Sequence, residues 1–203
     1  MELTTLDRSR HADAVAVLCD AFFDYPVMRF IIGPAAQYER RLNSLVGYFT
    51  AARFLNGDLV VGVADSNGAL IGVANVTRAG ERPPSPELAS LRETLWRELG
   101  SDARERYESL VRIWQTFAVE QPNVHLNMLG VRRAWQKRGV ARLLLDAVHD
   151  FSARTTESCG VTLSTEDPAN VPFYQRFGYR IVGEAPLPGA FTTWGFFRPN
   201  PPR

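Results

Sequence analysis

The first feature with chemical meaning is a basic segment that carries small residues, Gln136 to Arg142. It follows an apolar run typical of a buried strand and precedes an apolar run typical of a helix, so it falls at a predicted helix start. The first turn of a helix has unpaired N–H groups and a partial positive charge, which together favour a phosphate. Small residues let an oxygen approach the backbone, and cations add charge-assisted contacts. The segment therefore predicts a diphosphate site, formed by Gln136, Lys137, Arg138, Gly139, Val140, Ala141 and Arg142.

The spacing in this segment differs from the common nucleotide motifs. It has neither the three glycines of a dinucleotide-binding turn nor the Gly-Lys-Ser/Thr of a phosphate loop, so hydride transfer and nucleotide hydrolysis lack their usual signals. On the residues alone, a solvated surface turn explains the segment equally well. A second motif is needed to choose between the two interpretations.

That motif lies further along the chain and reads Asn170-Val171-Pro172-Phe173-Tyr174-Gln175-Arg176-Phe177-Gly178-Tyr179. Together with Gln136, Gly139 and Ala141 it resembles the GNAT acetyltransferases, whose signature is Gln/Arg-x-x-Gly-x-Gly/Ala and whose site is closed by a segment of the form Asn…Tyr-x-x-x-Gly-Phe. The puromycin N-acetyltransferase-like branch is the most similar, through Asp24-Tyr25-Pro26, a long helical insert before the fourth strand, and Pro168 to Tyr174. That branch often carries a Glu on the fifth strand where this chain has Ser164.

The resemblance implies a fold and an activity. The fold would be mixed α/β, with a mostly antiparallel sheet of about seven strands flanked by helices and with strands four and five splayed apart. The activity would be transfer of an acetyl group from acetyl-CoA to a primary amine of a small molecule, by direct attack in a ternary complex. Acylation of a protein or peptide, use of a longer acyl chain, and a CoA-binding regulatory module without turnover are the alternatives.

The resemblance also assigns roles to individual residues. Main-chain N–H groups around Gly130, those of Leu129 and Val131, would face the thioester and pantetheine, because splayed strands leave ladder groups free. Tyr174 would give its phenolic proton to the CoA sulfur, although a core aromatic is the alternative. Asn170 would bond the pantetheine or diphosphate, with a helix cap as its alternative.

Two residues are candidates for the base that accepts the amine proton. His125 lies on the fourth strand two residues before Asn127, and imidazole titrates near neutrality. Glu166 is the carboxylate nearest to Ser164. A structural His125 and a water relay without a dedicated base are alternatives. His11 and His149 lie on helical segments away from the motifs, and we expect them at the surface.

Aromatic side chains are the candidates for the acceptor pocket. They would favour an amine on an aromatic or apolar body, although aromatics at such spacing are usually core. The four candidates are Phe22, Tyr25, Phe191 and Trp194.

Composition limits the partners. The formal net charge is +1, so no global field would attract nucleic acid or an anionic membrane. No apolar run is long enough for a membrane span and the N-terminus lacks a secretory pattern, so we expect one cytoplasmic domain over residues 1–203, monomeric or homodimeric. Cys19 and Cys159 have no metal-ligand spacing, and we expect buried thiols and no metal.

The elements that must position these residues follow from hydrophobic periodicity and turn signals. Two charged helices before the fourth strand are expected to cover a substrate cleft, and residues 78–86 to form an exposed loop. We predict strands at 2–6, 58–65, 69–76, 124–131, 161–165, 179–183 and 191–197, and helices at 10–24, 36–54, 88–99, 107–117, 137–154 and 171–177.

Overall fold

A seven-stranded sheet forms the centre of the protein in the computed structural model, which describes residues 1–80, 83, 85–187 and 189–202. Neighbouring strands are antiparallel except for β4 and β5, which run parallel. The predicted mixed sheet is therefore confirmed. In the order in which they lie side by side, the strands are β1 (Glu2–Thr5), β2 (Leu59–Ala64), β3 (Leu70–Thr77), β4 (Val124–Val131), β5 (Gly160–Thr165), β7 (Phe191–Pro199) and β6 (Arg180–Leu187).

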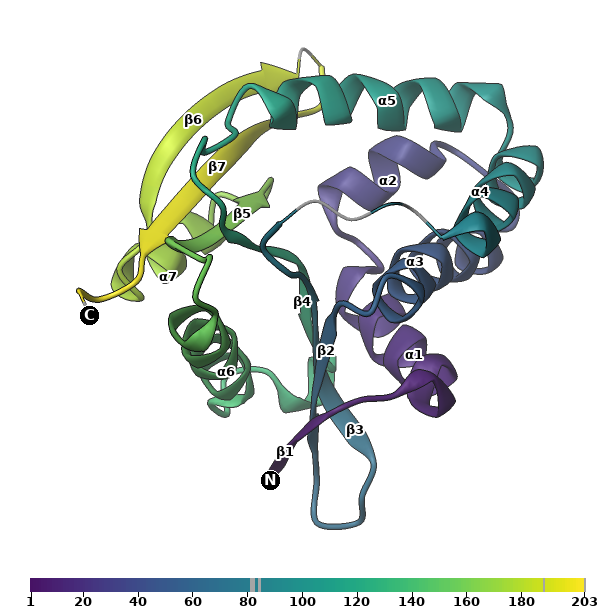
Figure 1. Ribbon diagram of the computed structural model, residues 1–203. Helices are drawn as coiled ribbons and strands as arrows, with labels where there is room; N and C mark the ends of the chain where they lie inside the picture. Colours follow the sequence, from purple (N-terminus) through teal and green to yellow (C-terminus); the bar gives the residue numbers. More distant parts are fainter. Residues whose placement is uncertain (81–82, 84, 188, 203) are drawn as a thin grey trace.

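Helices cover both faces of the sheet (Figure 1). On one face α6 packs across β2 to β5, and on the other α1 packs on β3 and β4 and is followed by α3, with α4 and α5 further out. Among the described residues, no helix combines the length and the apolar character needed to cross a membrane. The helices are α1 (His11–Phe22), α2 (Pro26–Ile32), α3 (Tyr38–Leu55), α4 (Pro86–Leu99), α5 (Ser101–Gln115), α6 (Val140–Arg154) and α7 (Asn170–Arg176).

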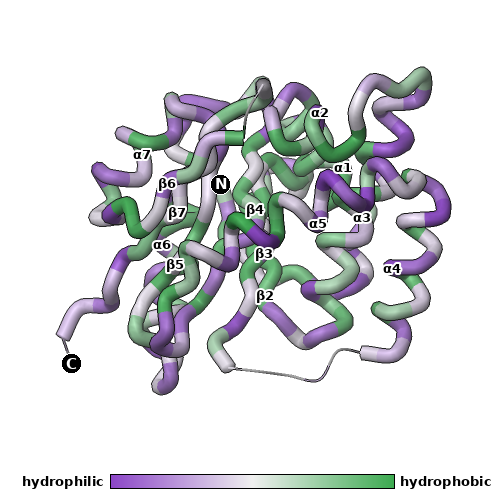
Figure 2. Tube along the Cα trace, turned by 90° about the horizontal axis from the view of Figure 1, so that it is seen from above, coloured by the Kyte–Doolittle hydropathy of each residue, from purple (hydrophilic) through white to green (hydrophobic). Residues whose placement is uncertain are grey.

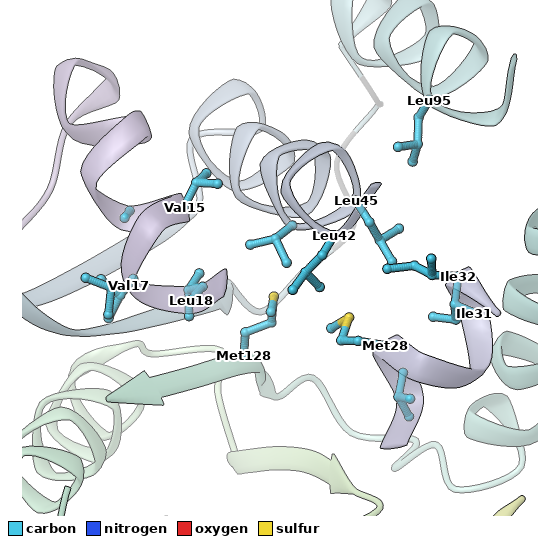
Figure 3. Packing of buried hydrophobic residues seen from close by; sticks show 14 of the residues in the cluster. Val15, Val17, Leu18, Met28, Ile31, Ile32, Leu42, Leu45, Leu95 and Met128 are labelled. Atoms are coloured by element: carbon cyan, nitrogen blue, oxygen red, sulfur yellow. The ribbon is translucent and has the colours of Figure 1, made fainter. Parts of the chain in front are cut away.

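Two hydrophobic clusters hold these layers together. Figure 3 shows the first, in which side chains of α1, α2 and α3 meet Met128 of β4. The second joins the opposite face of the sheet to α6 and α7. A Cβ at Gly72 would lie 2.5 Å from Val140 Cγ1, so this glycine is what lets the start of α6 approach β3. Hydrophobic segments run along the central strands in Figure 2, and hydrophilic segments alternate with hydrophobic ones along the outer helix α4.

The register of β4 explains how the sheet opens. β4 pairs with β5 only from Val124 to Leu126, so the two strands separate beyond that point, as predicted. On its other edge β4 pairs with β3 through a register shift that leaves Asn127 without a partner residue. The open end of β4 is therefore the half that runs from Asn127 to Val131.

Three expectations need correction. A further helix, α2, lies between the helices predicted at 10–24 and 36–54, and it begins at Pro26, where a proline at the first position is tolerated. His149 is buried, with 8% of its surface exposed, and His11 is half-buried with its Nε2 3.0 Å from the Gly47 carbonyl. The cysteines are free thiols but half-buried. Of the expected loop 78–86, residues 81, 82 and 84 lie outside the described part of the chain.

Candidate functional site

A cavity of about 680 Å³ lies where β4 and β5 separate. Its wall includes Leu129 of β4, Ser164 of β5 and Tyr174 of α7, and side chains of α1, α2, α3 and α5 complete it. A second hollow of about 450 Å³ lies beside the start of α6. Both are lined by a shared set of residues, so together they form one path from the sheet to the surface at α6. The shared residues are Val131, Gln136, Lys137, Ala141, Phe173 and Arg176.

The main chain of β4 presents donors to this cavity. The N–H of Arg132 donates to the Ile71 carbonyl of β3 at 2.9 Å. Since successive N–H groups of a strand point to opposite edges, the N–H groups of Leu129 and Val131 point toward β5, where the ladder has already ended. These two amides are available to a carbonyl oxygen of a bound molecule.

The loop before α6 presents free backbone N–H groups, as an anion-binding loop does. Lys137 and Gly139 have positive φ, 61° and 85°, which turn the chain into the helix. The first helical bond from this turn is Leu143 N–H to the Gly139 carbonyl, at 3.2 Å, and among the described residues no acceptor lies at the N–H groups of Val140, Ala141 and Arg142. A Cβ built on Gly139 meets nothing within 4 Å. The exposed loop therefore has free donors and open space in front of them.

A buried carboxylate, that of Glu166, lies directly after the last residue of β5. Glu166 is 4% exposed, and its Oε1 accepts from Thr193 Oγ1 at 2.7 Å and from Trp114 Nε1 at 3.2 Å. Burial raises the pKa of Glu166 above its usual value, and the two donors oppose that rise. A carboxyl with a raised pKa in a cavity is suited to accept a proton near neutral pH.

A hydrogen-bonded chain fixes the backbone beside this carboxylate. The Glu166 N–H donates to the hydroxyl of Tyr25 at 2.9 Å, and that hydroxyl lies 2.8 Å from Thr165 Oγ1. Asn170 Nδ2 donates to the same Thr165 oxygen at 3.1 Å. The chain thus connects the segment before α2, the end of β5 and the start of α7.

Tyr174 presents a hydroxyl that is still free to donate. Its ring packs against Phe173, Tyr179 and Phe196, while the residue lines the cavity. Within the described part of the chain its hydroxyl makes no hydrogen bond. Burial, and then the charge of Glu166, raises the pKa of Tyr174 above its usual value, so the phenol keeps its proton. This is the state that a proton donor requires.

His125 is held as a neutral imidazole. Its Nδ1 lies 2.9 Å from Thr162 Oγ1, and that hydroxyl donates its proton to Asn123 Oδ1 at 2.6 Å. Nδ1 must therefore carry the hydrogen, which leaves Nε2 as an acceptor. Burial, and then the charge of Arg53, lowers the pKa of His125 to about 4.

Comparisons with known proteins agree with this arrangement. Residues 108–187, less than half of the chain, match the family model described as Acetyltransferase (GNAT) domain. A structure described as histone acetyltransferase HPA2 and related acetyltransferase from Corynebacterium glutamicum is 19% identical, with a TM-score of 0.70 over 98% of this chain and 97% of that one. Arylalkylamine N-acetyltransferase 2 from Aedes aegypti is 12% identical, with a TM-score of 0.66 over 98% and 99%. The ribosomal-protein-S18-alanine N-acetyltransferase from Escherichia coli is 12% identical, with a TM-score of 0.59 over 100% and 95%.

This chain has the GNAT fold. The named structures include acetyltransferases for a small amine and for a protein, so the fold leaves the acceptor class open.

Within the GNAT fold, most of the residues predicted for the site line the two hollows. Gly130 has a packing role as well, because a Cβ there would lie 2.9 Å from Ala21 Cβ. Asn170 does not cap α7, whose N-cap is Ala169. The predicted residues that line the hollows are Phe22, Tyr25, His125, Leu129, Gly130, Val131, Gln136, Lys137, Gly139, Val140, Ala141, Arg142, Glu166, Asn170 and Tyr174.

Three predicted residues lie elsewhere. Arg138 places its guanidinium over the Trp135 ring, 5.2 Å from the centroid. Phe191 packs against Phe30, with ring centroids 5.6 Å apart, and Trp194 packs into the cluster under α6 and α7. None of these three is among the described residues that line either hollow.

Other lining residues were missed by the sequence analysis. Trp114 and Tyr107 belong to the helix predicted at 107–117 but were not proposed for the site, and Arg176 was one cation inside the second motif. Arg53 and Asn127 were not singled out at all. Only Arg176 had a signal in the sequence, because it is a basic residue one helical turn or less from Phe173 and Tyr174. No group of three or more metal-ligating side chains occurs among the described residues.

Proposed function

We propose that this chain is an acetyl-CoA-dependent N-acetyltransferase that acetylates a primary amine of a small molecule by direct attack in a ternary complex. The observation that carries the proposal is one cavity that contains the free amides of β4, the protonated hydroxyl of Tyr174 and the buried carboxylate of Glu166. The path from this cavity to the α6 loop supports a long nucleotide-bearing co-substrate as the acyl donor.

The residues present fit CoA at the loop before α6. The free N–H groups of Val140, Ala141 and Arg142 would hold its diphosphate, and Lys137 and Arg176 would add positive charge. Arg138 would contribute charge at the rim. The thioester of the bound co-substrate supplies the acetyl group. Residues of this chain would stabilise the acyl oxygen and transfer the protons.

Acyl transfer to an amine has three requirements, and each has a candidate in the cavity. The N–H groups of Leu129 and Val131 would stabilise the negative charge that develops on the acyl oxygen, typically by ~3 kcal/mol per donor. Glu166 would accept the proton of the attacking amine. Tyr174 would supply a proton to the departing sulfur, which its raised pKa keeps available at neutral pH.

Glu166 is the better candidate base than His125. Thr162, which pairs with His125, lies four residues from Glu166, a separation of ~13 Å along a strand. The charge of Glu166 contributes to the raised pKa of Tyr174, whereas His125 is affected by Arg53. Tyr174, the proposed proton donor, and Glu166 thus lie at one end of the site, and His125 lies at the other. A water relay is the remaining alternative to Glu166.

A small acceptor is favoured by the walls of the cavity. Phe22, Met28 and Ile31 make one side apolar, while Tyr107 and Trp114 of α5 cover it, so little room is left for a folded protein. Tyr174 and Glu166 argue against a regulatory module without turnover. We assign the activity to one domain, residues 1–203, acting in the cytoplasm as a monomer or homodimer without metal, nucleic acid or membrane. Membership of the puromycin N-acetyltransferase-like branch stays a prediction.

The test is a thiol-release screen with acetyl-CoA and the Tyr174→Phe variant as control. The acceptors are puromycin, aminoglycosides, arylalkylamines and short peptides with a free N-terminus. We expect release with at least one small amine, confirmed by the mass of the acetylated product. Release with peptides alone would favour protein acetylation, and binding of acetyl-CoA without release from any acceptor would favour the regulatory module.

A further inference from the structure

A polar cluster lies in the cavity beside the middle of β4, on the side away from the loop before α6. Arg53, near the C-terminal end of α3, donates through Nη1 to Asn127 Oδ1 at 2.9 Å and also to Thr77 Oγ1. Thr77 Oγ1 in turn donates to Asn127 Oδ1 at 2.8 Å. Arg53 and Asn127 both line the cavity.

These bonds leave several donors unused. Because Oδ1 of Asn127 accepts from two partners, the orientation of its amide is fixed, and the two N–H bonds of Nδ2 have no acceptor among the described residues. Arg53 Nη2 likewise has none within the described part of the chain. The cluster therefore offers N–H donors from two side chains, one of them charged, to whatever enters this end of the cavity.

The charge of Arg53 is incompletely compensated. Its ion pair is with Asp58, 3.5 Å from Nε, and one Asp58 oxygen also accepts from the backbone N–H of Arg78 at 3.1 Å. The Arg53 side chain is only 16% exposed, and burial lowers its pKa despite the nearby Asp58. A buried cation in this state gains from a second anion.

The other charges of the cavity wall are placed elsewhere. Lys137 and Arg176 lie at the hollow beside α6, and Glu166 and Asp167 lie beyond the end of β5. Of the charged residues described in the wall, Arg53 alone lies beside Asn127. An anionic group at this end would meet these donors and no carboxylate of the cavity wall, although the neutral His125 also lines the cavity here.

We propose that Arg53 and Asn127 bind a carboxylate at the far end of the acceptor, so that the substrate is an amine whose apolar or aromatic body ends in a carboxylate. This inference rests on the proposed function. Asn127 is two residues from Leu129, or ~7 Å along β4, so the amine and the carboxylate are about one substituted benzene ring apart. Phe49 and Tyr107 line the cavity and supply the aromatic surroundings for that ring.

The same contacts would also arise from a purely structural tie between α3 and the sheet. A structural role and a binding role both allow loss of stability when Arg53 is replaced. Only the binding role makes the preference for a charged acceptor depend on Arg53 and Asn127. The decisive quantity is therefore a ratio of two substrates measured on the same folded variant.

The experiment compares para-aminoethylbenzoate with its neutral isostere para-aminoethylbenzamide, by thiol release from acetyl-CoA. We expect wild-type kcat/KM to favour the benzoate by about tenfold or more, as a charge-assisted contact predicts. Arg53→Met should bring the ratio to about one while the benzamide is still acetylated. Asn127→Asp keeps an acceptor oxygen for Arg53 and Thr77 but replaces Nδ2 by oxygen, and should lower the ratio too. Arg40→Met, on an exposed arginine of α3, is the control and should keep the wild-type preference for the benzoate.

The outcomes separate the subsite from the function. Acetylation of the benzamide with no preference for the benzoate, or a preference that survives Arg53→Met, overturns the subsite and leaves the acetyltransferase intact. If neither amine is acetylated, calorimetric binding of the two probes to the CoA-loaded protein replaces kinetics. Tighter binding of the benzoate that is lost in Arg53→Met then supports the subsite, and equal binding overturns it.

Discussion

The indole Nε1 of Trp114 donates to Oε1 of Glu166 at 3.2 Å, which connects the end of α5 to the end of β5. The same oxygen accepts from Thr193 of β7. Burial disfavours the charged carboxylate and raises the pKa of Glu166, whereas Thr193, Trp114 and Tyr25 favour the charged form and lower it. The helical insert therefore contributes to the chemistry of the cavity as well as to its wall.

Removal of one hydrogen-bond donor to Glu166 should shift the pH dependence of turnover. Thr193→Val removes the 2.7 Å bond to Glu166, and the loss of a donor to a carboxylate raises the pKa of Glu166 further. Since the proposed base, Glu166, acts when deprotonated, the rising limb of the kcat/KM profile should move to higher pH. Thr192→Val, at the adjacent position of β7 and without a bond to Glu166, is the control. An unchanged limb in Thr193→Val would show that Glu166 does not control the rate.

Replacement of the Glu166 carboxylate by a neutral amide should lower turnover without lowering stability at alkaline pH. Glu166→Gln keeps an acceptor for Thr193 and Trp114 but removes the proposed base, and turnover should fall about a hundredfold. The folded pKa of Glu166 is raised, so the carboxyl favours the folded state when protonated, and that contribution is lost as pH rises above the unfolded value. Melting curves should show Glu166→Gln matching or exceeding wild type at alkaline pH. Asp167→Asn changes the neighbouring residue of the cavity wall and is the control, for which a hundredfold loss of turnover is not expected. Full activity of Glu166→Gln would favour a water relay in place of Glu166.

Two tyrosines of the same cluster should respond in opposite ways. Tyr174→Phe removes a hydroxyl that has no bond among the described residues, so stability should hold while kcat falls and affinity for acetyl-CoA is kept. Tyr179→Phe removes the 2.9 Å bond to the buried Nε2 of His149 and should cost about 1 kcal/mol of unfolding free energy with little effect on kcat. Denaturant unfolding and steady-state kinetics on both variants test this. Equal loss of kcat in the two would mean that Tyr174 acts only through packing.

The parts of the site that sequence predicts are those that are contiguous in the chain. β4 was predicted with its observed bounds, and the strand, the loop and the α6 start lie in one run of residues. Local rules suffice there, because a helix start presents free amides wherever it occurs. The α2 helix was missed since its seven residues are too few for a clear period and Pro26 resembles a break.

The rest of the site depends on contacts between distant segments. Trp114 and Glu166 are 52 residues apart, and Arg53 and Asn127 are 74 apart. In the sequence Trp114 is indistinguishable from its neighbours on the apolar stripe of α5. Phe191 and Trp194 show the converse, because they were assigned to the pocket as aromatic residues, although they pack into the two hydrophobic clusters. Periodicity identifies a buried face but not the partner that meets it.

A negative charge in the loop before α6 should weaken acetyl-CoA binding. Gly139→Asp places a carboxylate beside the free amides of α6, where it would repel a diphosphate, and its φ of 85° adds backbone strain. Gly68→Asp is the matched control, because Gly68 has a φ of 79° in the β2–β3 turn and a Cβ there also meets nothing within 4 Å. Both variants should lose similar stability, of about 1 kcal/mol. Calorimetric titration should show acetyl-CoA affinity lowered at least about tenfold in Gly139→Asp and unchanged in Gly68→Asp. Wild-type affinity in Gly139→Asp would mean that the diphosphate binds elsewhere, since the strain is common to both variants and only the position of the charge differs.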